Sequence, residues 1–221
     1  MNIALIVFAG SGVRMNNPTP KQFIKINGKE VVSYAINTFN KSPFIDEIVL
    51  VTHHDYLDYV AKMVDKYEFN KVTKIVPGGA TRQESVKLGL LAKEFDEKDK
   101  VLIHDGDRPL IKEELIEKCI AKLDEYDAVA PYIERKDELN EISNLGRNKE
   151  VNGKKFDIQT PQCFRYGLIK EYHLKYTDIS VSDDISLLEK DYEVCYLPGD
   201  KYNFKITTEM DMEYFKKLVS K

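Results

Sequence analysis

The strongest constraint on the fold is a series of five short apolar runs rich in valine and isoleucine. These runs cover residues 3–8, 47–52, 72–76, 101–104 and 128–133. They lack a regular alternation of apolar and polar residues, which is typical of strands buried on both faces of a parallel sheet. Between the runs, residues 32–39 and 116–123 repeat apolar side chains at helical spacing. The alternation of strands and helices predicts an α/β fold with right-handed crossovers.

Length and composition are those of one globular domain, which we expect to span residues 1–221. A chain of 221 residues with 43% hydrophobic and 32% charged residues is ordinary for a globular protein. Near its end, Thr208 and Asp211 have the spacing of a capping box. The box predicts a helix whose inner face includes Met212 and Phe215.

The charge pattern excludes several classes of protein. The 33 basic residues are scattered among 37 acidic ones, whereas a nucleic-acid-binding protein concentrates its basic residues on one face. No apolar run reaches the roughly 20 residues that cross a bilayer, and the N-terminus does not resemble a signal peptide. We therefore expect neither a nucleic-acid partner nor a membrane partner.

Cysteine and histidine spacing predicts neither disulfides nor a metal cluster. The three cysteines, at positions 119, 163 and 195, are odd in number and far apart. Reduced thiols and a cytoplasmic location are therefore expected. His53 and His54 are interpreted as the end of a strand, where neighbouring side chains point to opposite faces and do not share a metal ion.

One long polar stretch interrupts the strand–helix alternation. Residues 134–155 lack helical periodicity, and Asn152-Gly153 is a strong two-residue hairpin signal. We expect residues 134–158, called the arm segment below, to form a projecting β-hairpin arm that pairs with a second subunit in a homodimer. A disordered insertion is the alternative, because polar stretches of this length are uncommon inside a domain.

The stretch FAGSGVRMNNPTPKQF, residues 8–23, follows the first expected strand, at the edge of an α/β sheet where ligands bind. A dinucleotide fingerprint needs a glycine where Met15 stands, and a P-loop needs a Gly-Lys-Ser/Thr sequence that is missing. Gly10 and Gly12 let backbone N–H groups approach phosphate oxygens closely. Because Arg14 and Lys21 add positive charge at the same place, the stretch predicts a polyphosphate site.

Seven short blocks of the sequence carry further information: residues 10–15, 20–22, 78–86, 104–109, 160–162, 182–184 and 203–207. In this order they resemble the blocks of a family of cytidylyltransferases. The family includes the 2-C-methyl-D-erythritol 4-phosphate and ribitol 5-phosphate cytidylyltransferases, and the resemblance covers essentially the whole chain. It implies a Rossmann-like, mostly parallel sheet of nucleotidyltransferase type flanked by helices. It also implies transfer of CMP from CTP to a polyol phosphate, with Mg²⁺ as cofactor and pyrophosphate as the second product.

The resemblance also implies roles for particular residues. The catalytic cations would be Arg14, Lys21 and Lys205. The nucleotide would be bound by Ala9, Gly10, Gly12, Gly78, Gly79, Arg82 and Ser85. The second substrate would be bound by Asp105, Arg108, Arg135 and Thr160, with Asp105 also a Mg²⁺ ligand.

Simpler interpretations remain open for some of these positions. Gly78 and Gly79 also fit a turn after the third strand. Arg82 also fits the surface of the following helix. Asp183 and Asp184 fit the N-terminal cap of a helix that begins at Ile185.

The sequence departs from the family pattern at three places that face the acceptor. Glu134-Arg135 replaces an Asp-Thr pair, and Gly106-Asp107 replaces two alanines. Asn152 stands where the methylerythritol enzymes carry an arm arginine, so Arg135 or Arg147 is the candidate substitute. The missing arginine favours a pentitol phosphate used in teichoic acid or capsule biosynthesis over methylerythritol phosphate used in isoprenoid biosynthesis.

Two alternative functions belong to other classes. One is a sugar-1-phosphate nucleotidyltransferase that uses UTP or another nucleotide; the blocks at 160–162 and 203–207 speak against it. The other is a non-catalytic nucleotide-binding or interaction protein, which would be expected to have lost Arg14, Lys21 and Lys205.

Overall fold

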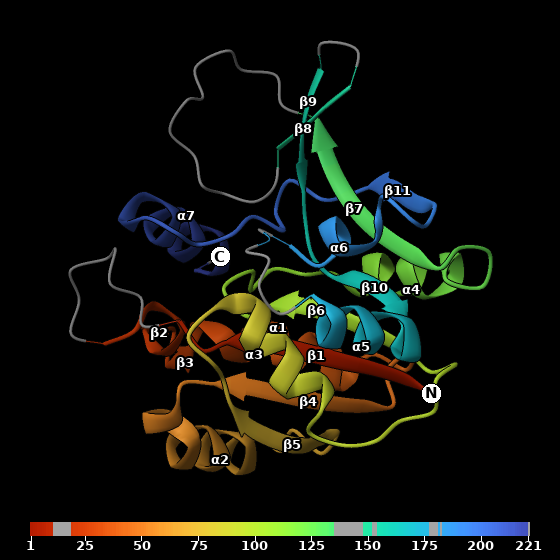
Figure 1. Ribbon diagram of the computed structural model, residues 1–221. Coiled ribbons are helices and arrows are strands. Elements are labelled where there is room, and N and C mark those ends of the chain that lie inside the picture. Colours follow the sequence, from red (N-terminus) through yellow and green to blue (C-terminus); the bar gives the residue numbers. More distant parts are fainter. Residues whose placement is uncertain (11–18, 135–147, 152–153, 177–180, 182, 221) are drawn as a thin grey trace.

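In the described part of the chain, nine strands form one sheet that is covered by helices (Figure 1). The computed structural model describes residues 1–10, 19–134, 148–151, 154–176, 181 and 183–220, with residues 148–151 and 154 described by their backbone alone. This sheet with its covering helices confirms the predicted α/β class.

The strands follow one another across the sheet in an order that differs from the chain order. This order is β5 (Val72–Pro77), β4 (Glu47–Thr52), β1 (Asn2–Phe8), β6 (Lys100–Asp105), β10 (Gln162–Arg165), β7 (Ala128–Glu134), β9 (Lys154–Ile158) and β8 (Asn148–Val151), while β11 (Val194–Pro198) also pairs with β7. The first four strands in this order are mutually parallel. All five strands predicted from the sequence are present, and their ends differ from the prediction by one residue at most.

The side chains of β1 point alternately into two hydrophobic cores. Ala4, Ile6 and Phe8 belong to the first core, and the alternate residues of β1 belong to the second. Helices α1 (Val31–Lys41), α2 (Leu57–Lys66) and α4 (Glu113–Lys122) contribute to the first core. Helices α3 (Arg82–Leu90), α5 (Tyr166–Lys175) and α6 (Ile185–Leu188) contribute to the second. Burial on both faces explains why β1, β4 and β6 are mostly apolar. The same expectation was wrong for β5, an edge strand in which Thr73 and Lys74 are exposed.

A third, smaller core joins the C-terminal helix to the start of the chain. Helix α7 (Glu209–Val219) contributes Met212 and Phe215, which pack with residues around the short hairpin of β2 (Lys25–Ile26) and β3 (Lys29–Glu30). Thr208 and Asp211 form the predicted capping box. This packing holds the segment before α7 beside η2 (Lys21–Phe23), the 3-10 helix that precedes β2.

The second half of the sheet is mixed. Strand β10 runs antiparallel to both β6 and β7, and β9 runs antiparallel to both β7 and β8. Strands β8 and β9 pair up to Val151 and Lys154, and the intervening residues 152–153 lie outside the described chain. In Figure 1 the two strands stand at the far end of β7, within the predicted arm segment.

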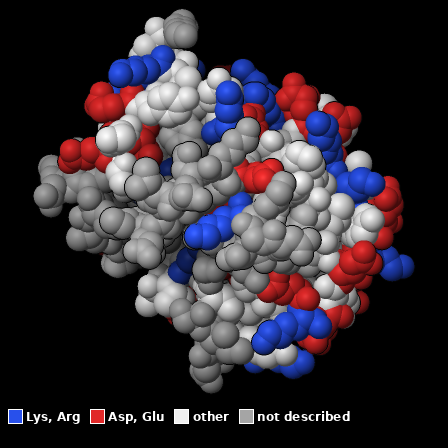
Figure 2. All heavy atoms as spheres, turned by 90° about the horizontal axis from the view of Figure 1, so that it is seen from above, with Lys and Arg blue, Asp and Glu red and all other residues white. Residues whose placement is uncertain are grey.

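Other features of the surface and the cysteines fit the sequence analysis. Basic and acidic side chains are interspersed on the face seen in Figure 2. The three cysteines are free thiols. No described helix has the length and apolar character needed to span a membrane.

Gly89 lets α3 lie directly on the sheet. A Cβ atom at this position would lie 2.5 Å from Leu5 Cδ1 and 2.7 Å from Val51 Cγ2, closer than such atoms approach one another. Helix α3 begins at Arg82 and includes Ser85, so its contact with the sheet also fixes the height of these two side chains.

We expect Gly89→Ala to destabilise the protein, although alanine favours a helix by about 1 kcal/mol over glycine. Overpacking costs about 1–3 kcal/mol, which outweighs the gain in propensity. Urea unfolding measures the difference, with Leu88→Ala on the exposed side of α3 as the control. A Gly89→Ala protein more stable than the wild type would contradict this packing.

Candidate active site

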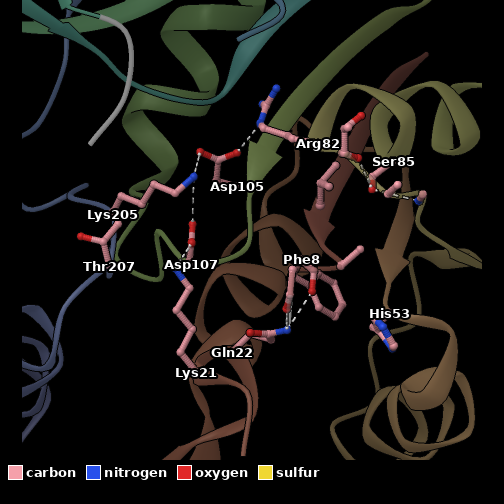
Figure 3. A pocket seen from close by; sticks show the side chains of 16 residues that line it. Phe8, Lys21, Gln22, His53, Arg82, Ser85, Asp105, Asp107, Lys205 and Thr207 are labelled. Carbon is pink, nitrogen blue, oxygen red and sulfur yellow. Dashed lines mark hydrogen bonds and ion pairs between the residues drawn. The ribbon is translucent and has the colours of Figure 1, made fainter. Parts of the chain in front are cut away.

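A cavity of about 640 Å³ opens at the edge of the sheet where β1 and β6 end (Figure 3). Among the residues that the structure describes, three cationic side chains and two carboxylates line it. The cations are Lys21, Arg82 and Lys205, and the carboxylates are Asp105 and Asp107. These residues come from η2, α3, the end of β6 with the loop that follows it, and the segment before α7. Parallel strands bring their carboxyl ends to one edge, which explains why residues so distant in sequence meet there.

The loop after β1 forms one wall of the cavity. Ala9 and Gly10 line it, and the side-chain amide of Gln22 donates to the carbonyl oxygens of Phe8 at 3.0 Å and Gly10 at 2.8 Å. These bonds fix the end of β1 relative to η2, and thereby to Lys21. The predicted site residues Gly12 and Arg14 lie outside the described chain.

The turn before α3 forms the opposite wall. Gly79 donates its N–H to Ser85 Oγ at 3.1 Å, and this hydroxyl donates to the carbonyl of Thr81 at 2.8 Å. A Cβ at Gly78 would lie 2.3 Å from Cβ of Ala9, so glycine permits the two walls to touch. The turn predicted for these glycines is therefore present, and Gly79 and Ser85 also line the cavity.

Asp105 is the centre of the charged network. Its Oδ1 accepts from Arg82 Nε at 3.0 Å, and its Oδ2 lies 3.0 Å from Lys205 Nζ and 3.5 Å from Arg108 Nε. Burial by itself raises the pKa of a carboxyl group, but Lys205, Arg82 and Arg108 together hold the pKa of Asp105 well below its usual range. Asp105 is therefore ionised at neutral pH.

Arg82 links Asp105 to a second buried carboxylate. Its Nη1 lies 2.8 Å from Asp184 Oδ2, and Asp184 Oδ1 lies 3.1 Å from His173 Nε2. Burial opposes ionisation of Asp184, but the charge of Arg82 and the contact with His173 lower its pKa. Arg82 is thus held by two carboxylates instead of lying free on the helix surface. The capping role falls to Asp183, whose Oδ1 accepts from the backbone N–H of Ser186 at 3.0 Å.

Lys21 and Lys205 meet at Asp107. Lys21 Nζ lies 2.5 Å from Asp107 Oδ2 and donates to the carbonyl of Ile206 at 2.6 Å. Lys205 Nζ lies 3.7 Å from Asp107 Oδ1. The two lysines, predicted as partners from blocks about 180 residues apart, therefore face the same part of the cavity. Sequence reasoning noted Asp107 only as a departure from the family pattern.

Hydrogen bonds of His104 and Thr160 hold the end of β6 in place. The ring of His104 is fully buried, and burial lowers its pKa to about 4, so it is neutral at pH 7. Its Nε2 lies 3.0 Å from the carbonyl oxygen of Arg108, which can only accept, so the single ring proton is on Nε2. Nδ1 then accepts from the hydroxyl of Thr160 at 3.0 Å, and the Thr160 oxygen accepts from the N–H of Asp105 at 3.2 Å.

This pattern affects the expected roles of Thr160 and Arg108. The Thr160 hydroxyl has one hydrogen, and it donates this hydrogen to Nδ1 of His104. In the described geometry it therefore has no hydrogen left to donate to a substrate phosphate. Arg108 is 4% exposed and donates from Nη1 to the carbonyl of Asn203 at 2.9 Å. Both side chains therefore lie against Asp105, just outside the lining of the cavity. Arg135 and Arg147 are outside the described chain.

His53 and His54 differ from the expectation. Strand β4 ends at Thr52, so His53 caps the 3-10 helix η3 (His54–Tyr56) and His54 is its first residue, and their ring centres lie 4.2 Å apart. Among the described residues, His53, His54 and Asp55 are the one group of three whose ligand atoms all lie within 4.8 Å of one another. The interpretation of opposite faces was wrong, because a turn does not alternate its side chains as a strand does.

Stability should fall as the pH decreases from about 6.5 to about 4, because His104 takes up a proton in the unfolded chain but not in the folded one. The loss should be on the order of 2 kcal/mol at pH 4.5 relative to pH 7. His104→Asn, which cannot titrate, should lack this part of the dependence. Urea unfolding of both proteins at the two pH values tests this, and equal losses in both would contradict it.

Comparisons with known proteins agree with the geometry. A family model described as 2-C-methyl-D-erythritol 4-phosphate cytidylyltransferase (IspD) matches residues 2–220. A protein of that name from Clostridium botulinum is 40% identical over 225 residues, covering 100% of this chain and 98% of the relative. Another from Clostridium novyi is 42% identical over 217 residues, covering 96% and 93%.

A solved structure has a fold similar to that of this chain. The crystal structure of 4-diphosphocytidyl-2C-methyl-D-erythritol synthase from Anaerococcus prevotii superposes with a TM-score of 0.82 at 31% identity, covering 100% of this chain and 96% of that one. Identity and coverage this high identify the family. The chain belongs to the 2-C-methyl-D-erythritol 4-phosphate cytidylyltransferase family, and it is a CTP-dependent nucleotidyltransferase.

Proposed function

We propose that the protein transfers CMP from CTP to 2-C-methyl-D-erythritol 4-phosphate and releases pyrophosphate. The observation that supports this most directly is the cavity, in which Lys21, Arg82 and Lys205 surround a space of about 640 Å³. The names of the relatives supply the acceptor. We do not retain the preference for a pentitol phosphate, because it depended on a single missing arm arginine.

The proposed reaction requires the protein, above all, to stabilise negative charge on phosphate oxygens. A phosphate oxygen of the acceptor forms a bond to the α-phosphorus of CTP while the bond from that phosphorus to the bridging oxygen of pyrophosphate breaks. The nucleophile is already an anion, so no general base is required. The barrier comes from bringing two anions together and from the charge that develops on the phosphate oxygens, and preorganised cations lower it.

We propose that Arg14, Lys21 and Lys205 are the cations that contact the triphosphate and the reacting phosphorus. We propose that the nucleotide is bound through backbone groups of two parts of the chain. These are Ala9, Gly10 and Gly12 after β1, and Gly78, Gly79 and Ser85 between β5 and α3. Arg82, which already joins Asp105 to Asp184, would hold the nucleotide side of the network in place. Arg108 and Thr160 would contribute to binding of the acceptor by holding Asp105 in position, since both contact Asp105.

Enzymes of this family depend on a metal ion. We propose that the ion is Mg²⁺, because hard cations prefer carboxylate and phosphate oxygens. Asp105 fits such an ion, since its carboxylate lines the cavity, stays ionised and already holds the ammonium group of Lys205. Asp105 would bind it together with phosphate oxygens of the nucleotide. The ion would help to neutralise the charge of the triphosphate.

Pyrophosphate release should be fastest for one pairing of nucleotide and acceptor. The assay combines CTP, UTP, ATP or GTP with 2-C-methyl-D-erythritol 4-phosphate, ribitol 5-phosphate or a hexose 1-phosphate, each with and without Mg²⁺. We expect turnover with CTP and methylerythritol phosphate, and with Mg²⁺ only. Preference for ribitol 5-phosphate would contradict the proposed acceptor, and absence of turnover with every pair would favour a non-catalytic binding protein.

We also propose that the chain acts as one domain over residues 1–221 and forms a homodimer through the arm segment, 134–158. Strand β8 stands at the end of the strand order, and an edge strand offers backbone groups to a second chain. Sedimentation at micromolar concentration should give a dimer, and a monomer would contradict this.

If Arg135 or Arg147 binds the acceptor phosphate, its replacement by alanine should raise the acceptor KM about tenfold and leave the KM for CTP unchanged.

A further inference from the structure

Asp107 forms ion pairs with Lys21 and Lys205, the two lysines that the proposed function assigns to phosphate binding. Its Oδ2 lies 2.5 Å from Lys21 Nζ and its Oδ1 lies 3.7 Å from Lys205 Nζ. Figure 3 shows the carboxylate between the two lysine side chains, inside the cavity. A phosphate that approached both ammonium groups would therefore meet a negative charge already there.

Neither lysine depends on Asp107 to keep its place. Lys21 also donates to the carbonyl of Ile206, and Lys205 also lies 3.0 Å from Asp105 Oδ2. If Asp107 merely positioned them, these second contacts would be redundant. Its distinct contribution is a negative charge, which offsets part of the positive charge of the cavity.

The carboxylate of Asp107 is also held more loosely than that of Asp105. Asp105 contacts two arginines and a lysine, whereas Asp107 Oδ1 is buried and accepts no hydrogen bond from the described residues. A buried oxygen without a donor costs free energy, so this side chain gives up its contacts more readily. The backbone is fixed independently, because the N–H of Ile206 donates to the carbonyl of Asp107 at 2.8 Å.

We propose that Asp107 is an internal competitor of phosphate: its carboxylate binds Lys21 and Lys205 and releases them when a polyphosphate enters. The inference rests on the proposed function, since it takes the two lysines to be phosphate ligands. Asp107 is then a residue that tunes affinity, with no part in the bond-making step. Its charge weakens the binding of CTP and of pyrophosphate alike, and so favours departure of the product.

The test is calorimetric titration of pyrophosphate into the metal-free protein in EDTA, so that no metal ligand is involved. Asp107→Asn, which keeps the shape and removes the charge, should bind pyrophosphate about tenfold more tightly than the wild type. Asp107→Ala should shift the affinity in the same direction, which covers the case in which asparagine disturbs folding. The control is Asp124→Asn, an exposed aspartate that also pairs with a lysine, Lys100, and should leave the affinity unchanged.

Tighter binding is a result that a purely structural role would not produce. Unchanged or weaker binding of pyrophosphate by both Asp107 variants would overturn the inference. Lys205→Gln separates this failure from that of the proposed function. If Lys205→Gln weakens pyrophosphate binding while the Asp107 variants do not strengthen it, the phosphate site stands and the competitor role falls. If Lys205→Gln also leaves binding unchanged, the lysines are not phosphate ligands and both proposals fall.

Discussion

The charge of Asp105 organises the whole site. A carboxylate that is 9% exposed is costly unless cations surround it, and here the cations come from three separate parts of the chain. Arg82 belongs to α3, Arg108 to the loop after β6, and Lys205 to the segment before α7. Each ion pair fixes one of these parts relative to the edge of the sheet. In the function we propose, the same cations would also bind the phosphates of the substrates, so that the stability of the site and its chemistry would have a common origin.

The sequence predicted the fold well where the signal is local. The five apolar runs became strands. Strands β1, β4 and β6 are buried almost throughout, as their apolar sequences predict, whereas β5 stands at the edge of the sheet and exposes Thr73 and Lys74. The capping box at Thr208 formed because its residues lie within one helical turn. The resemblance to the family implied that the blocks around Lys21, Arg82, Asp105 and Lys205 form one site, and the structure brings these four side chains to one cavity.

The parts that the sequence could not predict depend on contacts between distant side chains. The link between Lys21 and Asp107 joins residues whose approach is set by packing of the whole domain. The role of Thr160 follows from the tautomer of His104, which is fixed by a carbonyl four residues further along. For His53 and His54 the error was local, since the strand ends at Thr52 and the two histidines that follow it belong to the start of η3.

The most direct test of the account is the kcat/KM for CTP of Lys205→Gln, with Lys201→Gln on the exposed surface nearby as the matched control. Loss of one cation that stabilises developing charge should lower this ratio about a hundredfold, whereas Lys201→Gln should match the wild type. A Lys205→Gln enzyme as active as the wild type would contradict the claim that the charges around Asp105 form the site of nucleotidyl transfer.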